Sequence, residues 1–406
     1  MNSFILHYSR IRSFPIAFWI VIAATFINQI GNMAIVFLIL YLNDHLQFSL
    51  AHASFAFVTF STGMLISGIV GGSLVDKFGA ARMMTLSLFA NGTVFVFFPI
   101  AHAYFNILFL CMLVGLAYGL YRPASQTFVS QLSVPGMYKL TFSVYRLVIN
   151  LGMSIGPALG GYLAYYSFTS IFFVNGIANL IASAILFAGL FRSSWFKRRP
   201  TQPIVIGFKW LLHDAALRLF VMGMIPIFMI FFQHESTLAI FLHRNLHFPM
   251  YFYGLLFSLN TLLIVFFELP LNVATMNWPY RLNLTLGSFF ITAGFAGLYF
   301  ATEQWHVILL AIIWTLGEMI LYPAATSYIA EIAPESRRGS YMSMYSTCTN
   351  VGMLLGPWGG AIIMEKFGAS SLWVLCGWWG LIAIVILCSL SQSVDQFTHE
   401  QWGMLK

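Results

Sequence analysis

Long apolar segments follow one another along the whole chain, and they constrain the fold more than any other feature. A transmembrane helix needs about 20 consecutive, mostly apolar residues. Twelve segments meet this requirement: 14–42, 51–75, 82–100, 104–129, 139–164, 167–191, 216–243, 250–276, 282–301, 305–330, 339–364 and 369–391. We therefore predict an all-α integral membrane protein with twelve transmembrane helices, the tenth of them interrupted by Pro323.

The composition excludes other classes of protein. Lys, Arg, Asp and Glu make up 8% of the 406 residues, whereas soluble domains carry roughly 25%. A soluble core stops growing at about 250–300 residues and could not bury this much apolar surface. The segment 14–42 is too long for the apolar region of a signal peptide, so we expect it to remain as the first transmembrane helix. Four isolated cysteines inside apolar segments predict free thiols, with neither disulfides nor a metal site.

The positive charges predict the orientation in the membrane. Basic residues gather in cytoplasmic loops, and with both termini on the cytoplasmic side only Arg244 and Lys366 fall outside. The cytoplasmic side then holds fifteen: Arg10, Arg12, Lys77, Arg82, Lys139, Arg192, Lys197, Arg198, Arg199, Lys209, Arg218, Arg281, Arg337, Arg338 and Lys406. The net charge of +7 is thus a topology signal that faces anionic lipid, and a nucleic-acid partner is not expected.

The chain carries an internal repeat. A shift of 200 residues aligns Asn150-x-Gly-Met-x-x-Gly-Pro-x-x-Gly160 with Asn350-x-Gly-Met-x-x-Gly-Pro-x-x-Gly360, and Pro123 with Pro323. We predict a six-helix half over 1–191, a cytoplasmic linker over 192–214 with a surface segment at 204–213, and a second half over 215–406. Parallel repeats of this kind place a substrate site between the halves, near the middle of the membrane.

Two strings of small and charged residues carry specific expectations. In the loop expected after 51–75, Gly72 permits close approach to 339–364, Gly79 permits a tight turn, and Asp76 can face a helix N-terminus. Lys77 and Arg82 are expected to engage carboxylates there, and the corresponding loop of the second half keeps only Arg281, so any gate there must be asymmetric. In 139–164 the residues Gly152, Gly156, Gly160 and Gly161 form a face for close helix packing, and Pro157 is expected to bend the helix.

The first string resembles the cytoplasmic signature of the major facilitator superfamily, and the resemblance covers the entire chain. The second resembles the antiporter motif of that superfamily's proton-coupled multidrug exporters, although simple helix packing also explains its glycines. Phe232-Gln-His-Glu-Ser-Thr-Leu238, Gly317-Glu318-x-x-x-Tyr-Pro323 and Ala333-Pro-Glu-x-x-Arg-Gly339 are similar to the same bacterial group. The resemblance implies a major facilitator fold in a bacterial cytoplasmic (inner) membrane.

Charged residues inside the apolar segments are the candidates for function, because each costs roughly 2.5–3.5 kcal/mol at mid-membrane. They are Arg122 with Gln126 one turn on, Arg146 with Asn150 one turn on, Glu235, and Glu318. Glu235, beside polar Gln233, His234 and Ser236, is the preferred proton carrier and Glu318 the second, with a static ion pair as the alternative for either acid. Glu268 is interpreted as a gate or interface residue, and Gln29 either lines the cavity or packs.

No GxxxxGK[ST] nucleotide loop is present, so an ion gradient must supply the energy and no cofactor is expected. We therefore predict a secondary transporter, not an enzyme: a monomeric proton-coupled antiporter that exports small amphipathic or drug-like molecules by alternating access. Its partners are the small-molecule substrate, protons and membrane lipid. The alternative is an exporter or symporter of an anionic metabolite such as a siderophore or organic acid.

Overall fold

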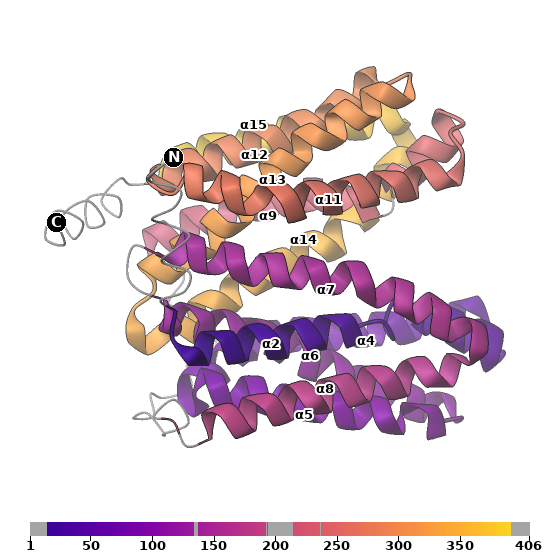
Figure 1. The fold of residues 1–406 in the computed structure, drawn as a ribbon. Helices are drawn as coiled ribbons and strands as arrows, with labels where there is room; N and C mark the ends of the chain where they lie inside the picture. Colours follow the sequence, from indigo (N-terminus) through magenta and orange to yellow (C-terminus); the bar gives the residue numbers. More distant parts are fainter. Residues whose placement is uncertain (1–13, 134–136, 192, 194–213, 236, 391–406) are drawn as a thin grey trace, which may run out of the picture.

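The computed structural model describes residues 14–133, 137–191, 193, 214–235 and 237–390, and these form helices joined by short turns (Figure 1). The first half contains α2 (Ile16–Gly31), α3 (Leu38–Leu40), η1 (Tyr41–His45), α4 (Leu50–Phe78), α5 (Ala80–Phe97), η2 (Phe98–Ile100), α6 (Tyr104–Leu132), α7 (Tyr138–Tyr166) and α8 (Phe168–Leu190). The second half contains α9 (Ala215–Phe231), η5 (Phe232–Glu235), α10 (Thr237–Ile240), η6 (Phe241–Asn245), α11 (Met250–Ala274), α12 (Tyr280–Gly297), η7 (Leu298–Phe300), α13 (Gln304–Ile332), η8 (Glu335–Arg337), α14 (Arg338–Phe367) and α15 (Ala369–Cys388). Most of the predicted linker, including 204–213, lies outside the described residues.

Each of the twelve predicted segments is helical. Ten helices of the described chain are long and apolar enough to span a membrane. The other two segments contain α2, which is only 16 residues long, and α14, which is long but buries Ser343, Ser346, Thr349 and Asn350. The segments 14–42 and 216–243 are each broken and end in a π-helical turn, η1 and η6.

The repeat seen in the sequence persists in the backbone. The offset of 200 residues relates α5 to α12 and α6 to α13 at their first and last residues. It also relates the positive φ angles of Gln47 (58°) and His247 (55°). The predicted interruption at Pro323 is wrong, since α13 runs through it as α6 runs through Pro123. Ser327 Oγ donates to the carbonyl of Pro323 at 2.5 Å, which illustrates how hydroxyl groups stabilise proline-containing membrane helices.

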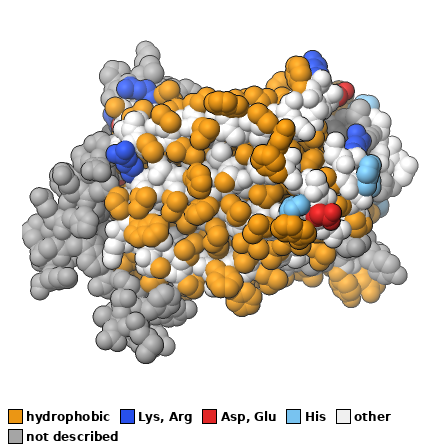
Figure 2. Space-filling view, turned by 90° about the horizontal axis from the view of Figure 1, so that it is seen from above, with side chains coloured by type: hydrophobic (Ala, Val, Ile, Leu, Met, Phe, Trp, Pro, Cys, Tyr) orange, Lys and Arg blue, Asp and Glu red, His pale blue; other side chains and the backbone are white. Residues whose placement is uncertain are grey.

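The outer surface is that of a membrane protein. Large apolar side chains are exposed on it, for example Phe105 (82%) and Phe300 (77%). Figure 2 shows hydrophobic side chains across the middle of one face, with charged side chains toward its two ends. Apolar patches of this extent require an apolar solvent, which the hydrocarbon of a bilayer provides.

The two halves meet mainly at one end of the bundle. We call it the Asp76 end; it holds the C-termini of α4 and α11 and the N-termini of α7 and α14. There α4 packs on α14, and α7 packs on α11 and α13. Figure 1 shows α7 and α11 close together at this end and diverging toward the other, which we call the opposite end. The described structure is therefore sealed at the Asp76 end.

Candidate functional site

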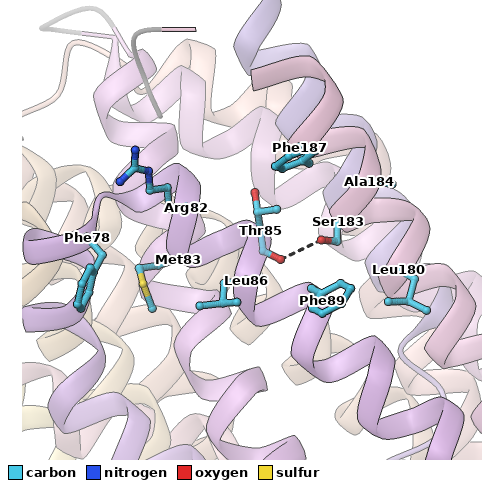
Figure 3. Close-up of a pocket in the computed structure, with 10 residues that line it drawn as sticks. All are labelled: Phe78, Arg82, Met83, Thr85, Leu86, Phe89, Leu180, Ser183, Ala184 and Phe187. Carbon is cyan, nitrogen blue, oxygen red and sulfur yellow. Dashed lines mark hydrogen bonds between the residues drawn. The ribbon is translucent and has the colours of Figure 1, made fainter. Parts of the chain in front are cut away.

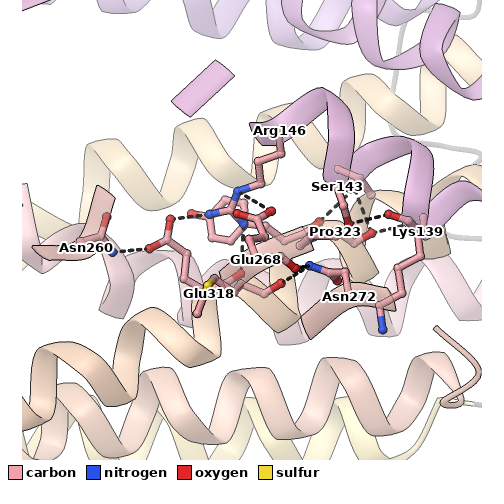
Figure 4. Close-up of polar contacts among 12 residues, drawn as sticks. Lys139, Ser143, Arg146, Asn260, Glu268, Asn272, Glu318 and Pro323 are labelled. Carbon is pink, nitrogen blue, oxygen red and sulfur yellow. Dashed lines mark hydrogen bonds and ion pairs between the residues drawn. The ribbon is translucent and has the colours of Figure 1, made fainter. Parts of the chain in front are cut away.

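A cluster of three charged residues joins the halves inside the membrane (Figure 4). Arg146 of α7 places Nη2 2.5 Å from Glu318 Oε1 of α13 and Nε 3.5 Å from Glu268 Oε1 of α11. Arg146 Nη1 also donates to the backbone carbonyl of Glu318 at 3.0 Å. One arginine of the first half is thus shared between two carboxylates of the second.

Neighbouring side chains hold Arg146 and Glu318 in this arrangement. Asn260 Nδ2 donates to Glu318 Oε2 at 2.8 Å and to Thr315 Oγ1 at 3.0 Å. The Arg146 guanidinium lies over the Tyr322 ring, 4.5 Å from its centroid. Both oxygens of Glu318 therefore have partners, and the arginine is held from two sides.

Glu268 is the unbalanced member of the cluster. Its side chain is fully buried, at 0% exposure, and neither carboxylate oxygen accepts a hydrogen bond from a described residue. One turn on, Asn272 Oδ1 is also buried without a donor. A single cation shared by two ionised acids leaves one net negative charge, and an uncompensated charge is costly in a membrane interior. A proton on Glu268 would make the cluster neutral.

Glu235 lies elsewhere. It ends η5, where the seventh predicted segment breaks, and its side chain is exposed and does not contact Arg146. Its predicted role as the first proton carrier stays a prediction. The sequence did place Arg146 and Glu318 among the site residues, but it assigned Glu268 to a gate or interface. The available signal was that Glu268 is an isolated acid in an apolar segment, the same signal as for Glu318.

Arg122 is a second cation near the interface of the halves. Its side chain is half-buried, and no hydrogen bond or ion pair links it to another described residue. It lies close enough to the hydroxyl groups of Tyr145, Tyr322 and Tyr345 to interact with them electrostatically. Its charge is therefore available to a ligand.

The other predicted polar site residues are Gln126 and Gln29, which are buried, and Asn150, which is half-buried. Gln126 accepts a hydrogen bond at 3.3 Å from Ser346 of the other half. Asn150 Nδ2 and Gln29 Oε1 are buried without a partner among the described residues. These two unsatisfied groups leave both readings of Gln29 open, cavity lining and packing.

The charged motif of residues 71–82 acts partly as expected. Helix α4 continues to Phe78, so the glycines and Asp76 belong to its last turns, and only Gly79, with φ of 91°, makes the turn. Asp76 accepts hydrogen bonds from Gly339 N at 2.6 Å, Ser340 N at 2.9 Å and Ser340 Oγ at 2.6 Å. A carboxylate at the N-terminus of α14 interacts favourably with the helix dipole.

Gly72 permits this contact. A Cβ atom on Gly72 would lie 2.5 Å from Ser343 Cβ and 2.7 Å from the carbonyl oxygen of Gly339, so α4 and α14 approach as predicted. Lys77 and Arg82 were expected to engage carboxylates at this end, and this expectation is not met. Neither side chain forms an ion pair with a described carboxylate. Lys77 lies over the Phe78 ring at 5.2 Å, and Arg82 lines a groove on the outside of the bundle.

Lys139 is an inter-half residue that the sequence analysis treated only as a topology signal. It is 4% exposed, and Nζ donates to Thr275 O and Oγ1, both at 2.7 Å, and to Asn283 Oδ1 at 2.9 Å. Thr275 is the C-cap of α11, so the ammonium group lies at the negative end of that helix. Lys139 thus ties α7 to the second half at the Asp76 end.

The glycine face of α7 packs within the first half. Gly152 and Gly156 lie against the backbone of Gln29 and Ile30 in α2, and Gly160 lies against Met33 and Phe37. The repeated glycines Gly352 and Gly356 lie against Phe228 and Met229 of α9 in the same way. Gly161 is more loosely packed, and Pro157 has no described side chain. The face therefore packs helices within each half, and it does not line the interface of the halves.

The described residues contain no candidate metal site. None of their His, Cys, Asp and Glu side chains form a group of three that could hold a metal ion. The four cysteines are free, as expected, and Cys111, Cys348 and Cys376 are buried.

Known proteins share this architecture. The family model of the Major Facilitator Superfamily matches residues 21–252 and 235–397. The chain is 24% identical to the uncharacterized MFS-type transporter YqjV of Bacillus subtilis (strain 168), over 87% of this chain and 88% of that one. It is 23% identical to the multidrug resistance protein MdtH of Aeromonas salmonicida (strain A449), over 79% and 81%.

A solved structure gives the same fold. A bacterial homologue of the iron transporter ferroportin in an outward-facing state superposes with a TM-score of 0.77 at 15% identity, over 92% of this chain and 99% of that one. Twelve helical segments in two repeated halves, with polar contacts between the halves, agree with the family match. The chain belongs to the major facilitator superfamily of membrane transporters.

Proposed function

We propose that this transporter is a proton-coupled antiporter that exports small amphipathic or drug-like molecules, with Arg146, Glu268 and Glu318 as its coupling centre. The observation that carries the proposal is the single arginine shared between two carboxylates across the interface of the halves. The multidrug resistance name of one relative supports the class of substrate.

The cluster can exchange a proton for a cationic substrate. With the Asp76 end sealed, Arg146 neutralises Glu318 and a proton neutralises Glu268. When that end opens, α7 moves away from α11 and α13 and takes Arg146 with it. The two acids then face water, Glu268 releases its proton, and a cationic substrate compensates one of their two negative charges.

Closing the Asp76 end reverses these steps. Arg146 returns to Glu318 and competes with the substrate for the carboxylates. The substrate leaves toward the opposite end, and a proton from that side neutralises Glu268. The cluster is neutral while the Asp76 end is sealed, which avoids burying a net charge in the membrane. While that end is open, water solvates the charge that the substrate leaves uncompensated.

The distribution of positive charge assigns a direction to this cycle. In the predicted orientation the Asp76 end faces the cytoplasm of a bacterial cell, so the described structure faces outward. Substrate then binds from the cytoplasm and leaves on the outside, while the proton moves inward. The gradient of protons across the inner membrane drives the export.

Glu268→Gln and Glu235→Gln separate this coupling centre from the alternative acid. Everted membrane vesicles that contain each variant are supplied with a fluorescent lipophilic cation, and substrate-driven proton flux is measured. We expect Glu268→Gln to abolish the flux and Glu235→Gln to retain it at a comparable amount of folded protein. The opposite pattern would transfer the role to Glu235 and reject the cluster as the coupling centre.

The half-buried cation of Arg122 favours a second candidate, transport of an anionic metabolite such as an organic acid. A carboxylate substrate could neutralise Arg122, which has no ion pair with a described residue. Direct binding of a radiolabelled organic acid and of a fluorescent lipophilic cation, measured separately, distinguishes the candidates. If organic anions bind to the wild type and lose their affinity in Arg122→Gln, while lipophilic cations fail to bind, the second candidate replaces the first.

A further inference from the structure

A groove on the outside of the bundle lies between α5 and α8 (Figure 3). These helices are on the side of the first half that lies away from α11 and α13, which carry the two acids of the charged cluster (Figure 1). Its volume is about 790 Å³, and most of its lining residues are apolar. Phe89, Ala184 and Phe187 are exposed, so the groove opens to the surroundings of the bundle. Because this surface lies in the membrane, the groove opens to lipid.

The hydroxyl groups in the walls of the groove already have hydrogen-bond partners within the protein. Besides Arg82, its polar side chains are Thr85 and Ser183. Thr85 Oγ1 donates to Ala81 O at 2.8 Å, and Ser183 Oγ donates to Thr85 O at 3.0 Å. Both hydroxyl groups are thus satisfied by the protein, and the walls suit a hydrocarbon chain better than a polar substrate.

Arg82 is the one charged residue of the lining, and Figure 3 shows it at the edge of the groove. It lies in the first turn of α5, directly after the turn at Gly79, where the chain enters the membrane. Its guanidinium forms no hydrogen bond or ion pair with a described residue, although the sequence predicted a carboxylate partner. A guanidinium is well suited to hold a phosphate through two parallel hydrogen bonds.

The arrangement of charge and apolar surface matches one kind of ligand. Arg82 and Phe89 are two helical turns apart, about 10 Å along the axis. The groove therefore has a cation at the membrane boundary and apolar walls deeper in the membrane. The predicted orientation places this boundary in the cytoplasmic leaflet, which carries anionic lipid. We propose that the groove binds an anionic phospholipid, with the headgroup phosphate on Arg82 and one acyl chain between α5 and α8. This proposal does not depend on the coupling mechanism.

Native mass spectrometry of the full chain in a neutral detergent tests the proposal. The probes are phosphatidylglycerol and phosphatidylcholine with identical acyl chains. We expect the wild type to bind the first about fivefold more tightly, which corresponds to one basic residue near the lipid surface. Arg82→Gln should lose this preference, and Ala184→Trp, which fills the groove, should weaken the binding of both lipids.

Arg281→Gln is the matched control, because Arg281 is a half-buried arginine at the start of α12, the helix that corresponds to α5. It should retain the preference for phosphatidylglycerol. An unchanged preference in Arg82→Gln overturns the proposal, as does an equal loss in Arg281→Gln. Displacement of the lipid by one equivalent of tetraphenylphosphonium would make the groove a substrate site, and a change of oligomeric state in Ala184→Trp would make it a subunit interface; either result also overturns it.

Discussion

Asp76→Asn should loosen the seal between the halves. In the described structure the two oxygens of Asp76 accept three hydrogen bonds, from Gly339 N, Ser340 N and Ser340 Oγ, at 2.6–2.9 Å. An asparagine keeps one acceptor oxygen, turns an NH₂ group toward a donor and removes the charge at the N-terminus of α14. Hydrogen bonds to a charged group contribute about 1.5–3 kcal/mol each, and water compensates part of the loss at this half-buried site. We expect a net loss of roughly 2–3 kcal/mol for the sealed state, which is about a 30- to 150-fold shift toward the open one.

A cysteine at position 346 reports this shift. Ser346 is 1% exposed and lies between the halves, where its hydroxyl donates a long hydrogen bond of 3.3 Å to Gln126. In a Cys388→Ser background, Ser346→Cys should react with N-ethylmaleimide only when the Asp76 end opens. The rate of labelling should therefore rise in Asp76→Asn by the factor of about 30–150 derived above.

Asp214→Asn is the control for this experiment. Asp214 is also an acid at the Asp76 end, but it caps α9 by accepting from Leu217 N at 3.0 Å, and its partner Tyr341 belongs to the same half. Its loss should leave the labelling rate within about twofold of the parent, because its two hydrogen-bond partners among the described residues belong to its own half. Equal rates in Asp76→Asn, Asp214→Asn and the parent would refute the claim that Asp76 holds this end closed.

Three further outcomes follow from packing. Gly72→Ala places a Cβ atom within 2.7 Å of the α14 backbone, so it should also raise the labelling rate at position 346. Gly152→Ala places its Cβ 2.5 Å from Gln29 Cβ inside one half, so it should lower the temperature of thermal unfolding by several degrees without raising that rate. Among the four cysteines only Cys388 is not buried, so mass spectrometry after brief maleimide treatment of the native protein should find the label there.

The architecture could be predicted from the sequence because it depends on composition and periodicity. The length of the apolar segments required twelve helices, and the offset of 200 residues required two similar halves. The roles of Gly72 and Asp76 also followed from a physical rule, and the structure agrees with both. Gly72 allows α4 and α14 to approach closely, and Asp76 lies at the N-terminus of α14. Each of these inferences needs only a pattern in the sequence and a general rule.

The partners of the buried charges could not be predicted in this way. Arg146, Glu268 and Glu318 lie on three helices, and their meeting depends on how each helix is rotated and on its depth in the bundle. Glu235 ends η5, where the segment breaks, and its side chain is exposed, so a position in a continuous helix did not predict its surroundings. Lys139 was counted with the basic residues that face lipid, although the packing of α7 on α11 buries it.

The two contacts that close the Asp76 end use opposite charges on opposite helix ends. At the α4–α14 contact an acid, Asp76, meets a helix N-terminus. At the equivalent α7–α11 contact the position related by the repeat is Met276, and no acid is available. There Lys139 instead meets the C-terminus of α11 at Thr275. Both contacts pair a charge with the complementary end of a helix dipole, so the lost acid of the second half does not leave that side unsealed. The asymmetry predicted from the motif therefore lies in the charge of the residue that makes each contact: an acid at the α4–α14 contact and a base at the α7–α11 contact. Both contacts close the Asp76 end.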